Sequence, residues 1–521
     1  MTTKNEEKCR FCTPKSPKTP QNGPTNRKHA IFGAQTPIFW TQTSRPSKMK
    51  ELNKALHRTA HKAPPVTADV MQRNYMNSKL YLVVVLAVAF LARLLFLSCY
   101  GPVHCNDTPG YMEVSSMIGS GNFSGYTGWR TPGYPIIMYL CGNSYTHIVV
   151  LQSLCGIIGT LLLFYSLLRS TCSPHIALLY GLFLASALNM VVIDSNIMTE
   201  SLAACLFATI VFLLFAEDTT SHPIRWPHSL AMGLLMGFLI VIRPQFIAMI
   251  PVVTFYMAFR WYTFKQPIWR FTLPAFLVSA CIPVIMLLGF NTAHLGKPML
   301  STTIGFNISQ HTLPFIESAK RVDTMGIIPE TVRLRDEYWD FAQSLDDNRA
   351  FIPRPEIAGT KVEQSDYLVR LSKEAIKNNP LKYLQSATSA WMRFWRVSLL
   401  YDADNTRCSA LDKYAMFMWP IYKLLWLFLN LLFLISSGLA VITVLKRREI
   451  GWYECSIALI LAVSILQALV EYGDNSRYAI PLEPSVGMIA VYSLFARDNN
   501  RITIASTLRR FRWRSTSESE A

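Results

Sequence analysis

Charged side chains are scarce in this chain. Of its 521 residues only 16% are Asp, Glu, Lys or Arg, while 51% are hydrophobic, and the mean hydropathy is +0.24. A soluble domain needs more charge than this on its surface, so the composition excludes an ordinary soluble protein. Uncharged runs long enough to cross about 30 Å of hydrocarbon recur from Leu80 onward. The sequence therefore predicts a polytopic membrane protein.

Three further absences limit the classes of protein to which the chain can belong. The sequence has no internal repeat of the kind that builds many transporters. Arg93 and Lys423 are the only charged residues well inside the predicted spans, whereas transport sites place ionisable groups at mid-membrane. The 11 cysteines have no repeating spacing, which argues against a zinc site. Four of them fall on one side of the membrane in the topology below, which leaves a disulfide open: Cys99, Cys105, Cys141 and Cys408.

The positive charge is concentrated at the two ends of the chain. The formal net charge is +17, and residues 1–79 alone carry 15 Lys and Arg against 4 acids. The C-terminal segment 497–521 adds six Arg. Basic residues gather in this way on the cytoplasmic side of membrane proteins, so we expect both termini in the cytoplasm and contact with anionic lipid. Nucleic-acid binding is not expected.

The predicted fold class is an all-α polytopic membrane protein with about ten transmembrane helices and one larger extracytoplasmic α-rich domain. The break at Arg243-Pro244 is interpreted as an outer turn between two spans, because Pro does not continue a helix cleanly. The ten predicted spans are 80–100, 145–168, 174–193, 199–216, 228–242, 244–259, 271–290, 414–445, 453–471 and 478–496.

Five regions follow from these spans. They are a disordered basic cytoplasmic tail (1–76), an N-terminal transmembrane region (77–290) with a catalytic first outer loop (101–144), an extracytoplasmic domain (291–413), C-terminal transmembrane helices (414–496) and a basic cytoplasmic tail (497–521). In the outer domain, residues 361–378 suggest an amphipathic helix that ends near Asn379-Pro380. A second helix follows, and we expect Trp391, Phe394 and Trp395 to anchor it at the membrane interface.

Carboxylates and arginines from separate outer loops fall on one face of the membrane. The segment from Asn106 to Pro135 is a polar loop rich in Gly and Pro, which indicates a shaped loop rather than a linker. The short outer segments contain only three basic residues, Arg130, Arg243 and Arg477. The acids on that face are Asp107, Glu113, Asp194, Glu200, Glu471 and Asp474, and Gln245 lies beside Arg243.

This set of side chains suits the transfer of a sugar to a hydroxyl group. A carboxylate can take the hydroxyl proton, and fixed donors or a metal can stabilise the negative charge on the leaving group. If the leaving group is a phosphate on a lipid, it must sit at the membrane surface, where Arg can bind it bidentately.

The chain resembles the GT-C superfamily of membrane glycosyltransferases at these residues. It is similar in particular to the bacterial protein-O-mannosyltransferase-like and aminoarabinose-transferase-like families. The resemblance covers most of residues 80–320, then 371–396 and 471–496. The features that carry it, in order, are Asp107 with Tyr111, Arg130 to Tyr134-Pro135, Thr199-Glu200, Gly233 to Pro251, Asn291 to Asn307, Asn379-Pro380 to Trp395, and Arg477 to Pro481.

The resemblance implies inverting transfer of a sugar from a polyprenyl-phosphate donor to a lipid, glycan or protein acceptor on the extracytoplasmic face. It implies that Asp107 is the base or a metal-site carboxylate and Glu200 a supporting acid. Arg243 and Arg477 become candidates for the donor phosphate, and Tyr111, Arg130 and Tyr134 for substrate contacts. Family members often show Asp-Glu where this chain has Asp107-Thr108, so no cofactor is certain and a divalent metal stays open. A bacterial plasma membrane is the expected location.

Structural interpretations stand beside each functional one. Asp107 could cap a helix, Thr199 and Glu200 could cap another, Arg243 and Arg477 could reach lipid headgroups, and Arg130 could stack on Trp129. Two other functions are also open. A transporter or flippase of lipid-linked glycans is the first. The second is an inactive scaffold or receptor, which a wide separation of Asp107, Arg243 and Arg477 would favour.

Overall fold

The structure of the protein is a computed structural model. It describes residues 68–170, 172–218, 226–264, 269–345, 349–448, 450–473, 475–496 and 503–507, all of which belong to one compact unit, residues 68–521. The described residues are helical apart from turns, loops and two isolated β-bridges, Tyr100 with Thr406 and Val103 with Asn196. Most of the two predicted tails lies outside the described residues. Residues 68–76, predicted as the end of the disordered tail, instead begin the first described helix, which corrects that boundary.

The predicted spans correspond to helices or to broken helices, which confirms an all-α polytopic membrane fold. Seven helical segments of the described chain are long and apolar enough to cross a bilayer, and an eighth is counted if the pair α6 and α7, bent by 41°, forms one span. The seven are α2 (Ala68–Cys99), α5 (Tyr145–Arg169), α8 (Glu200–Asp218), η1 (Pro244–Ala248) with α10 (Met249–Phe264), α11 (Trp269–Leu295), α16 (Ser409–Arg447) and α17 (Trp452–Val470).

The remaining predicted spans are short or interrupted, so ten is an approximate count. The bent pair is α6 (Pro174–Ser186) and α7 (Leu188–Ser195), and α9 (Trp226–Ile242) is apolar but shorter than the others. The last predicted span is divided into α18 (Asn475–Ala479) and α19 (Glu483–Phe495). Broken helices leave polar backbone groups and side chains at their ends, and that is where the charged residues of this protein meet.

Helices α9 and α11 pack closely because α9 presents glycines to its neighbour. A Cβ atom on Gly233 would lie 2.5 Å from the carbonyl oxygen of Phe276, and one on Gly237 would lie 2.5 Å from that of Ala280. Small residues four apart allow two helix backbones to approach within a membrane, where apolar burial gives no extra drive for association. This contact holds the end of α9, which leads directly into Arg243.

The outer region is a helical domain with its own hydrophobic core. Its elements are α12 (Thr303–Thr312), η2 (Leu313–Val322), α13 (Ile328–Ser344), η3 (Arg349–Phe351), α14 (Lys361–Asn378), α15 (Pro380–Phe394) and η4 (Ala403–Asn405). A capping box between Thr360 and Glu363 starts α14. Phe315, Tyr367 and Leu371 are among the residues of the core. The amphipathic helix predicted at 361–378 is therefore confirmed.

The predicted membrane anchor on α15 is wrong in detail. Phe394 and Trp395 are buried, and the Trp395 ring lies 5.4 Å from that of Phe433 on α16. Trp391 donates a hydrogen bond to Ser464 on α17 (3.1 Å). These aromatics join the domain to the spans, and the exposed apolar residues of α15 are Leu381, Leu384 and Met392.

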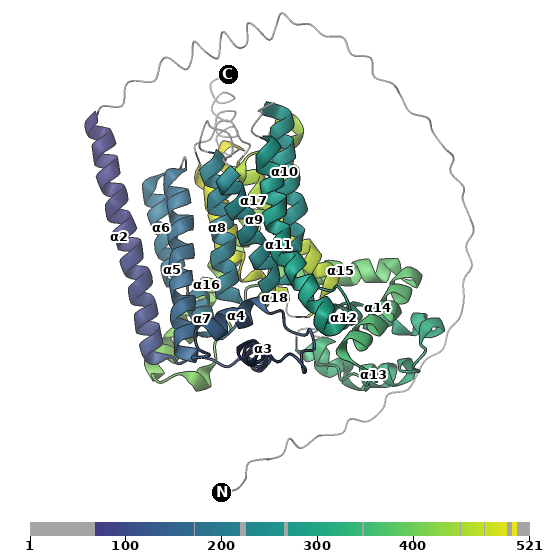
Figure 1. Ribbon diagram of the computed structural model, residues 1–521. Helices are drawn as coiled ribbons and strands as arrows, with labels where there is room; N and C mark the ends of the chain where they lie inside the picture. The colour runs from purple at the N-terminus through teal and green to yellow at the C-terminus, as the bar shows by residue number, and fades with distance from the viewer. Residues whose placement is uncertain are drawn as a thin grey trace, which may run out of the picture. The chain divides into compact units, whose positions relative to one another are not determined.

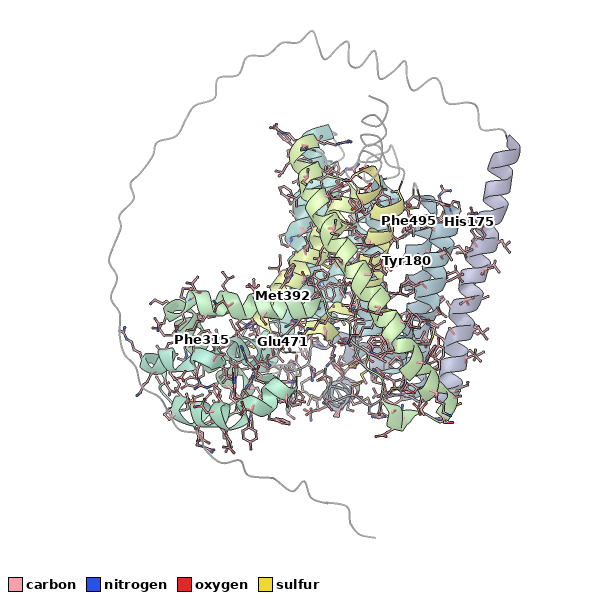
Figure 2. All side chains as sticks on the ribbon, turned by 180° about the vertical axis from the view of Figure 1, so that it is seen from behind. His175, Tyr180, Phe315, Met392, Glu471 and Phe495 are labelled. Carbon is pink, nitrogen blue, oxygen red and sulfur yellow. The ribbon has the colours of Figure 1, made fainter. Side chains whose placement is uncertain are left out.

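Figure 2 shows Met392, Phe315 and Glu471 toward one end of the bundle and His175 and Phe495 toward the other.

Two short helices of the first outer loop, α3 (Thr108–Ser120) and α4 (Gly133–Leu140), lie at the end of the bundle that also holds α7 and α18 (Figure 1). Gly133 fits against the backbone of Val241 at the end of α9, because a Cβ there would come within 2.8 Å of the Val241 carbonyl group. The loop is thereby fixed beside the break that follows α9.

Replacing Gly237 with Val tests the α9–α11 contact. The added side chain would overlap Ala280 and Pro283, so we expect a loss of about 2 kcal/mol of stability, measured as a lower melting temperature in detergent. Gly289→Val on α11 is the matched control, because no atom lies within 4 Å of a Cβ built there. Equal melting temperatures for the two variants would contradict the packing argument.

Candidate active site

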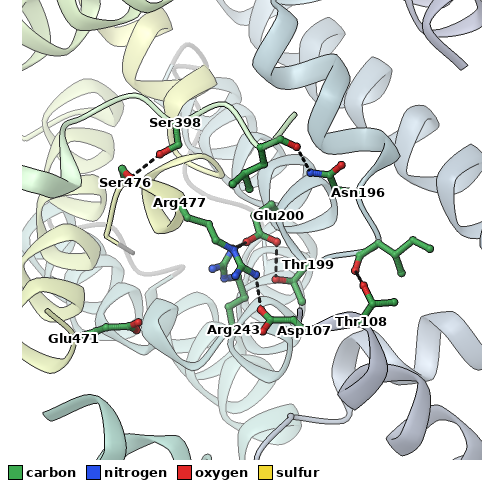
Figure 3. A network of polar contacts seen from close by, with 12 residues as sticks. Asp107, Thr108, Asn196, Thr199, Glu200, Arg243, Ser398, Glu471, Ser476 and Arg477 are labelled. Carbon is green, nitrogen blue, oxygen red and sulfur yellow. Dashed lines mark hydrogen bonds and ion pairs between the residues drawn. The ribbon is translucent and has the colours of Figure 1, made fainter. Parts of the chain in front are cut away.

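Five charged side chains from four parts of the chain form a continuous row of ion pairs. Arg130 contacts one carboxylate oxygen of Asp107, and Arg477 donates to the other from Nη2 (2.5 Å). The Nε of Arg477 donates to Oε1 of Glu200 (2.7 Å), and Nη1 of Arg243 lies 3.3 Å from that same oxygen. Figure 3 shows Asp107, Glu200, Arg243 and Arg477 pointing toward one another.

The row runs from a partly open end to a closed one. The side chains of Arg130, Asp107 and Arg477 are 22%, 18% and 18% exposed, whereas Arg243 is 6% exposed and Glu200 is fully buried. A substrate can therefore meet Asp107, Arg130 and Arg477. Glu200 and Arg243 lie behind them, where they balance and orient Arg477.

Neighbouring opposite charges in the row stabilise the ionised form of each side chain. Burial alone would raise the pKa of Asp107, but the guanidinium groups of Arg477 and Arg130 hold it below its usual range. Burial lowers the pKa of Arg477, and Glu200 and Asp107 more than compensate, so it lies above its usual value. Three arginines and two carboxylates give the row a net charge of +1. Such a site attracts an anion.

Asp107 is held by backbone contacts on the segment that precedes it. Val103 donates to Ser195 (2.9 Å) and accepts from Ile197 (3.0 Å), which ties the segment to the end of α7. Thr108 then donates its hydroxyl to the Ile197 carbonyl (3.0 Å). Asp107 occupies the cap position of α3 but makes no capping hydrogen bond. The contacts thus exclude the helix-cap interpretation of this carboxylate.

Arg130 is placed by a loop that is fastened to the end of α11. The Tyr126 hydroxyl donates to Asn291 (3.0 Å), and the Thr302 amide donates to the Gly128 carbonyl (3.0 Å). Gly128 has a φ of +70°, and a Cβ there would lie 2.5 Å from Leu295, so this tight turn requires glycine. The guanidinium of Arg130 stacks on Tyr111 (5.1 Å to the ring centre).

The aromatic residues predicted for substrate binding mainly support the site. Tyr111 and Tyr134 are both buried, with ring centres 5.1 Å apart. The Tyr134 hydroxyl donates to Gln152 (2.6 Å), and Gln152 donates in turn to the carbonyls of Asp194 (3.0 Å) and Asn196 (2.8 Å). Tyr134 is therefore part of a buried hydrogen-bond network, and its contact with a substrate stays a prediction.

Several of the predicted outer charges are not part of the row. Asp194 is buried in an ion pair with Arg93 (2.9 Å). Glu113 is exposed on α3. Glu471 accepts from Asn307 (3.2 Å) and Gln467 (3.1 Å) and lies apart from the row in Figure 3. Asp474 lies outside the described residues.

The surroundings of Asp107 do not fit a divalent metal. Both of its oxygens accept from guanidinium groups, and the nearest other carboxylate, Glu200, is shared by two arginines. A dication needs a cluster of oxygen ligands rather than neighbouring cations. Within the described residues, no group of three His, Cys, Asp or Glu could hold a metal.

Comparison with known proteins supports the predicted class. Residues 134–287 match the family described as dolichyl-phosphate-mannose-protein mannosyltransferase. Over those residues the match confirms the predicted resemblance to the GT-C superfamily of membrane glycosyltransferases. No curated protein is a significant match.

Two solved structures are similar at low identity. ArnT from Cupriavidus metallidurans bound to undecaprenyl phosphate is 13% identical, with 78% of this chain and 76% of that chain covered and a TM-score of 0.34. The apo state is 12% identical, with 81% and 78% covered and the same TM-score.

Three residues that support the site are not apparent from the sequence. Gln152 lies inside a predicted span, and a polar residue there is a signal of function or of tertiary contact. Tyr478, which follows Arg477, lies 4.8 Å from the Arg243 guanidinium. Asn291 accepts a hydrogen bond from the Tyr126 hydroxyl. The last two lie inside the segments that carry the family resemblance, although no local pattern shows their contacts.

Substituting Glu200 tests the closed end of the row. Glu200→Gln removes the charge that Arg243 and Arg477 share, so the buried Arg243 loses its carboxylate while Arg477 keeps only Asp107, and we expect a loss of about 3 kcal/mol of stability. Thermal unfolding in detergent measures the change. The control is Glu330→Gln, which breaks the exposed pair with Arg333 (2.7 Å) and should leave the unfolding temperature close to that of the wild type, because solvent screens exposed ion pairs. A smaller loss for Glu200 than for Glu330 would contradict the burial argument.

Substituting Arg130 tests the electrostatics of Asp107. Because the pKa of Asp107 lies below its usual range, its carboxylate stays charged at neutral pH and is protonated only in acid. Arg130→Gln removes one of the two cations that lower this pKa, so the pKa of Asp107 should rise. If Asp107 acts as a catalytic base, the acidic limb of the plot of reaction rate against pH should then move to higher pH. Arg130→Lys retains the charge and should leave the limb near its original pH. An unmoved limb in Arg130→Gln would show that Arg130 does not tune Asp107.

Proposed function

We propose that the protein transfers a sugar from a polyprenyl-phosphate donor to an acceptor hydroxyl group by an inverting single displacement. The observation that supports this most is the position of Asp107, a partly exposed carboxylate held between two partly exposed arginines at an end of the helical bundle. A base and anion-binding groups are thus adjacent at one surface, which the chemistry of glycosyl transfer requires. The family match over 134–287 supports the same class.

The proposed reaction uses the open end of the row. The acceptor hydroxyl approaches Asp107, whose oxygens each retain a lone pair after binding Arg130 and Arg477. The hydroxyl oxygen attacks the anomeric carbon of the sugar while its proton passes to Asp107. The bond from that carbon to the phosphate oxygen breaks on the opposite side, and polyprenyl phosphate leaves with the electron pair.

The two phosphate-binding candidates take different roles in this proposal. Arg477 is partly exposed and can bind the phosphate while it orients Asp107. Arg243 is almost fully buried and pairs with Glu200, so it acts through Glu200 on Arg477. Arg130 replaces it as the second group for the phosphate. Glu200, with no exposed surface, is a positioning residue rather than a general acid.

The proposed setting is a bacterial plasma membrane. The chain is a multi-pass integral membrane protein, and we place both termini in the cytoplasm and Asp107 on the outer face. The donor lipid then lies with its phosphate at that face and its alkyl chain among the helices. A lipid, glycan or protein supplies the acceptor hydroxyl.

Asp107→Asn tests the proposed base. Membranes containing the full chain would be supplied with a panel of polyprenyl-phosphate sugars and with a membrane extract as the source of acceptors. Mass spectrometry would follow released polyprenyl phosphate and newly glycosylated products. Loss of the base should lower the rate by about 10²- to 10⁴-fold. Glu113→Gln, an exposed acid on α3, is the control and should retain the wild-type rate.

The alternatives predict different results. Undiminished transfer by Asp107→Asn at wild-type abundance would reject Asp107 as the base. Movement of lipid-linked sugars across proteoliposomes without release of polyprenyl phosphate would reject the transferase in favour of a flippase. An inactive scaffold would follow from separated site residues, but Asp107, Arg243 and Arg477 belong to one row of contacts.

A further inference from the structure

Two segments far apart in sequence are held together at the end of α2. The Arg407 amide donates to the Cys99 carbonyl (2.7 Å), and Tyr100 forms a β-bridge with Thr406. The side-chain amide of Asn405 donates to the Gly101 carbonyl (2.9 Å). These contacts fix the chain from residue 99 to 101 in register with the chain from residue 405 to 407.

Two cysteines lie at the end of this pairing. Cys408 directly follows Arg407, whose amide is bonded to the Cys99 carbonyl, and the Cys99 thiol is one of the groups that act on the Cys408 thiol. Both cysteines are partly exposed. A disulfide requires two Cα atoms within about 7 Å, and the backbone contact beside Cys408 keeps the two chain segments adjacent.

The Cys408 thiol lies at the start of a helix. It precedes the first residue of α16, and the backbone amides of Ala410 and Leu411 lower the pKa of its thiol, as does the neighbouring Cys99 thiol. The thiolate is the form that attacks a disulfide in exchange reactions.

We propose that Cys99 and Cys408 form a disulfide on the face that carries Asp107, by exchange with a disulfide-bearing oxidant. The Cys408 thiolate attacks one sulfur of the oxidant and releases the other as a thiolate. The Cys99 thiol loses its proton and attacks Cys408 in the mixed disulfide, which releases the second thiol of the oxidant. The pair loses two protons and two electrons, and the oxidant becomes a dithiol.

The bond would fasten the segment that carries the proposed base. Asp107 follows Cys99 by eight positions, and Val103 between them is already tied to α7. A covalent link at Cys99 adds a fixed point at the start of this segment and joins α2 to α16. The inference does not require sugar transfer.

The chain contains a matched pair that should stay reduced. Cys155 on α5 and Cys205 on α8 are also in side-chain contact. Each is 8% exposed and lies within a span, where a soluble oxidant has no access. The two thiols are therefore neighbours in each pair, but a soluble oxidant can reach only Cys99 and Cys408.

The test is differential thiol labelling of the full-length protein in membranes prepared without reductant. N-ethylmaleimide would block free thiols, and reduction followed by a heavy maleimide would mark those released from disulfides. Peptide mass spectrometry should show Cys99 and Cys408 with the heavy label and Cys155 and Cys205 with the light one. A peptide joined through Cys99 and Cys408 should appear before reduction.

Two variants make the result specific. Cys99→Ser should leave Cys408 with the light label, and Cys408→Ser should do the same for Cys99. Light label on both residues in wild-type membranes, even after treatment with oxidised glutathione, would overturn the proposal, and so would a bond from either residue to Cys105 or Cys141. A Cys99–Cys408 bond in a protein that transfers no sugar would reject the proposed function and leave this inference standing.

Discussion

The arrangement of the site depends on Arg477, whose guanidinium joins two carboxylates from distant parts of the chain. It binds Asp107 at the start of α3 and Glu200 at the start of α8. Each carboxylate has a second arginine, Arg130 for Asp107 and Arg243 for Glu200, so loss of Arg477 would divide the row into two separate ion pairs. The guanidinium group of Arg477 thereby connects the first loop to the start of α8. Its donors point in fixed directions within one plane, so a lysine could not replace it.

Much of the fold follows from composition and hydrophobic runs, because a membrane span must satisfy its backbone internally and present apolar side chains to lipid. Most of the predicted spans are present for this reason. The helix at 361–378 was predictable from its amphipathic period instead. The contacts of α15 could not be predicted, since Trp395 suits lipid and a protein partner equally well. Its burial against Phe433 depends on where α16 lies.

The composition of the site was predictable, but its connectivity was not. Counting charges on the outer face identifies Asp107, Glu200, Arg243 and Arg477, and the structure brings these residues together. Sequence order does not show that Asp194 pairs with Arg93 and not with an arginine of the row, because either pairing is compatible with the predicted topology. Sequence order also gives no measure of solvent access, which distinguishes the partly exposed Asp107 from the buried Glu200.

The net charge of the row has a kinetic consequence under the proposed reaction. The donor is a phosphodiester with one negative charge, whereas the polyprenyl phosphate left behind is a monoester of about −1.5 to −2 at neutral pH. A row of net charge +1 attracts the spent lipid more strongly than the fresh donor. Turnover would then be governed by the escape of the lipid carrier, and accumulation of that carrier in the membrane would inhibit the enzyme.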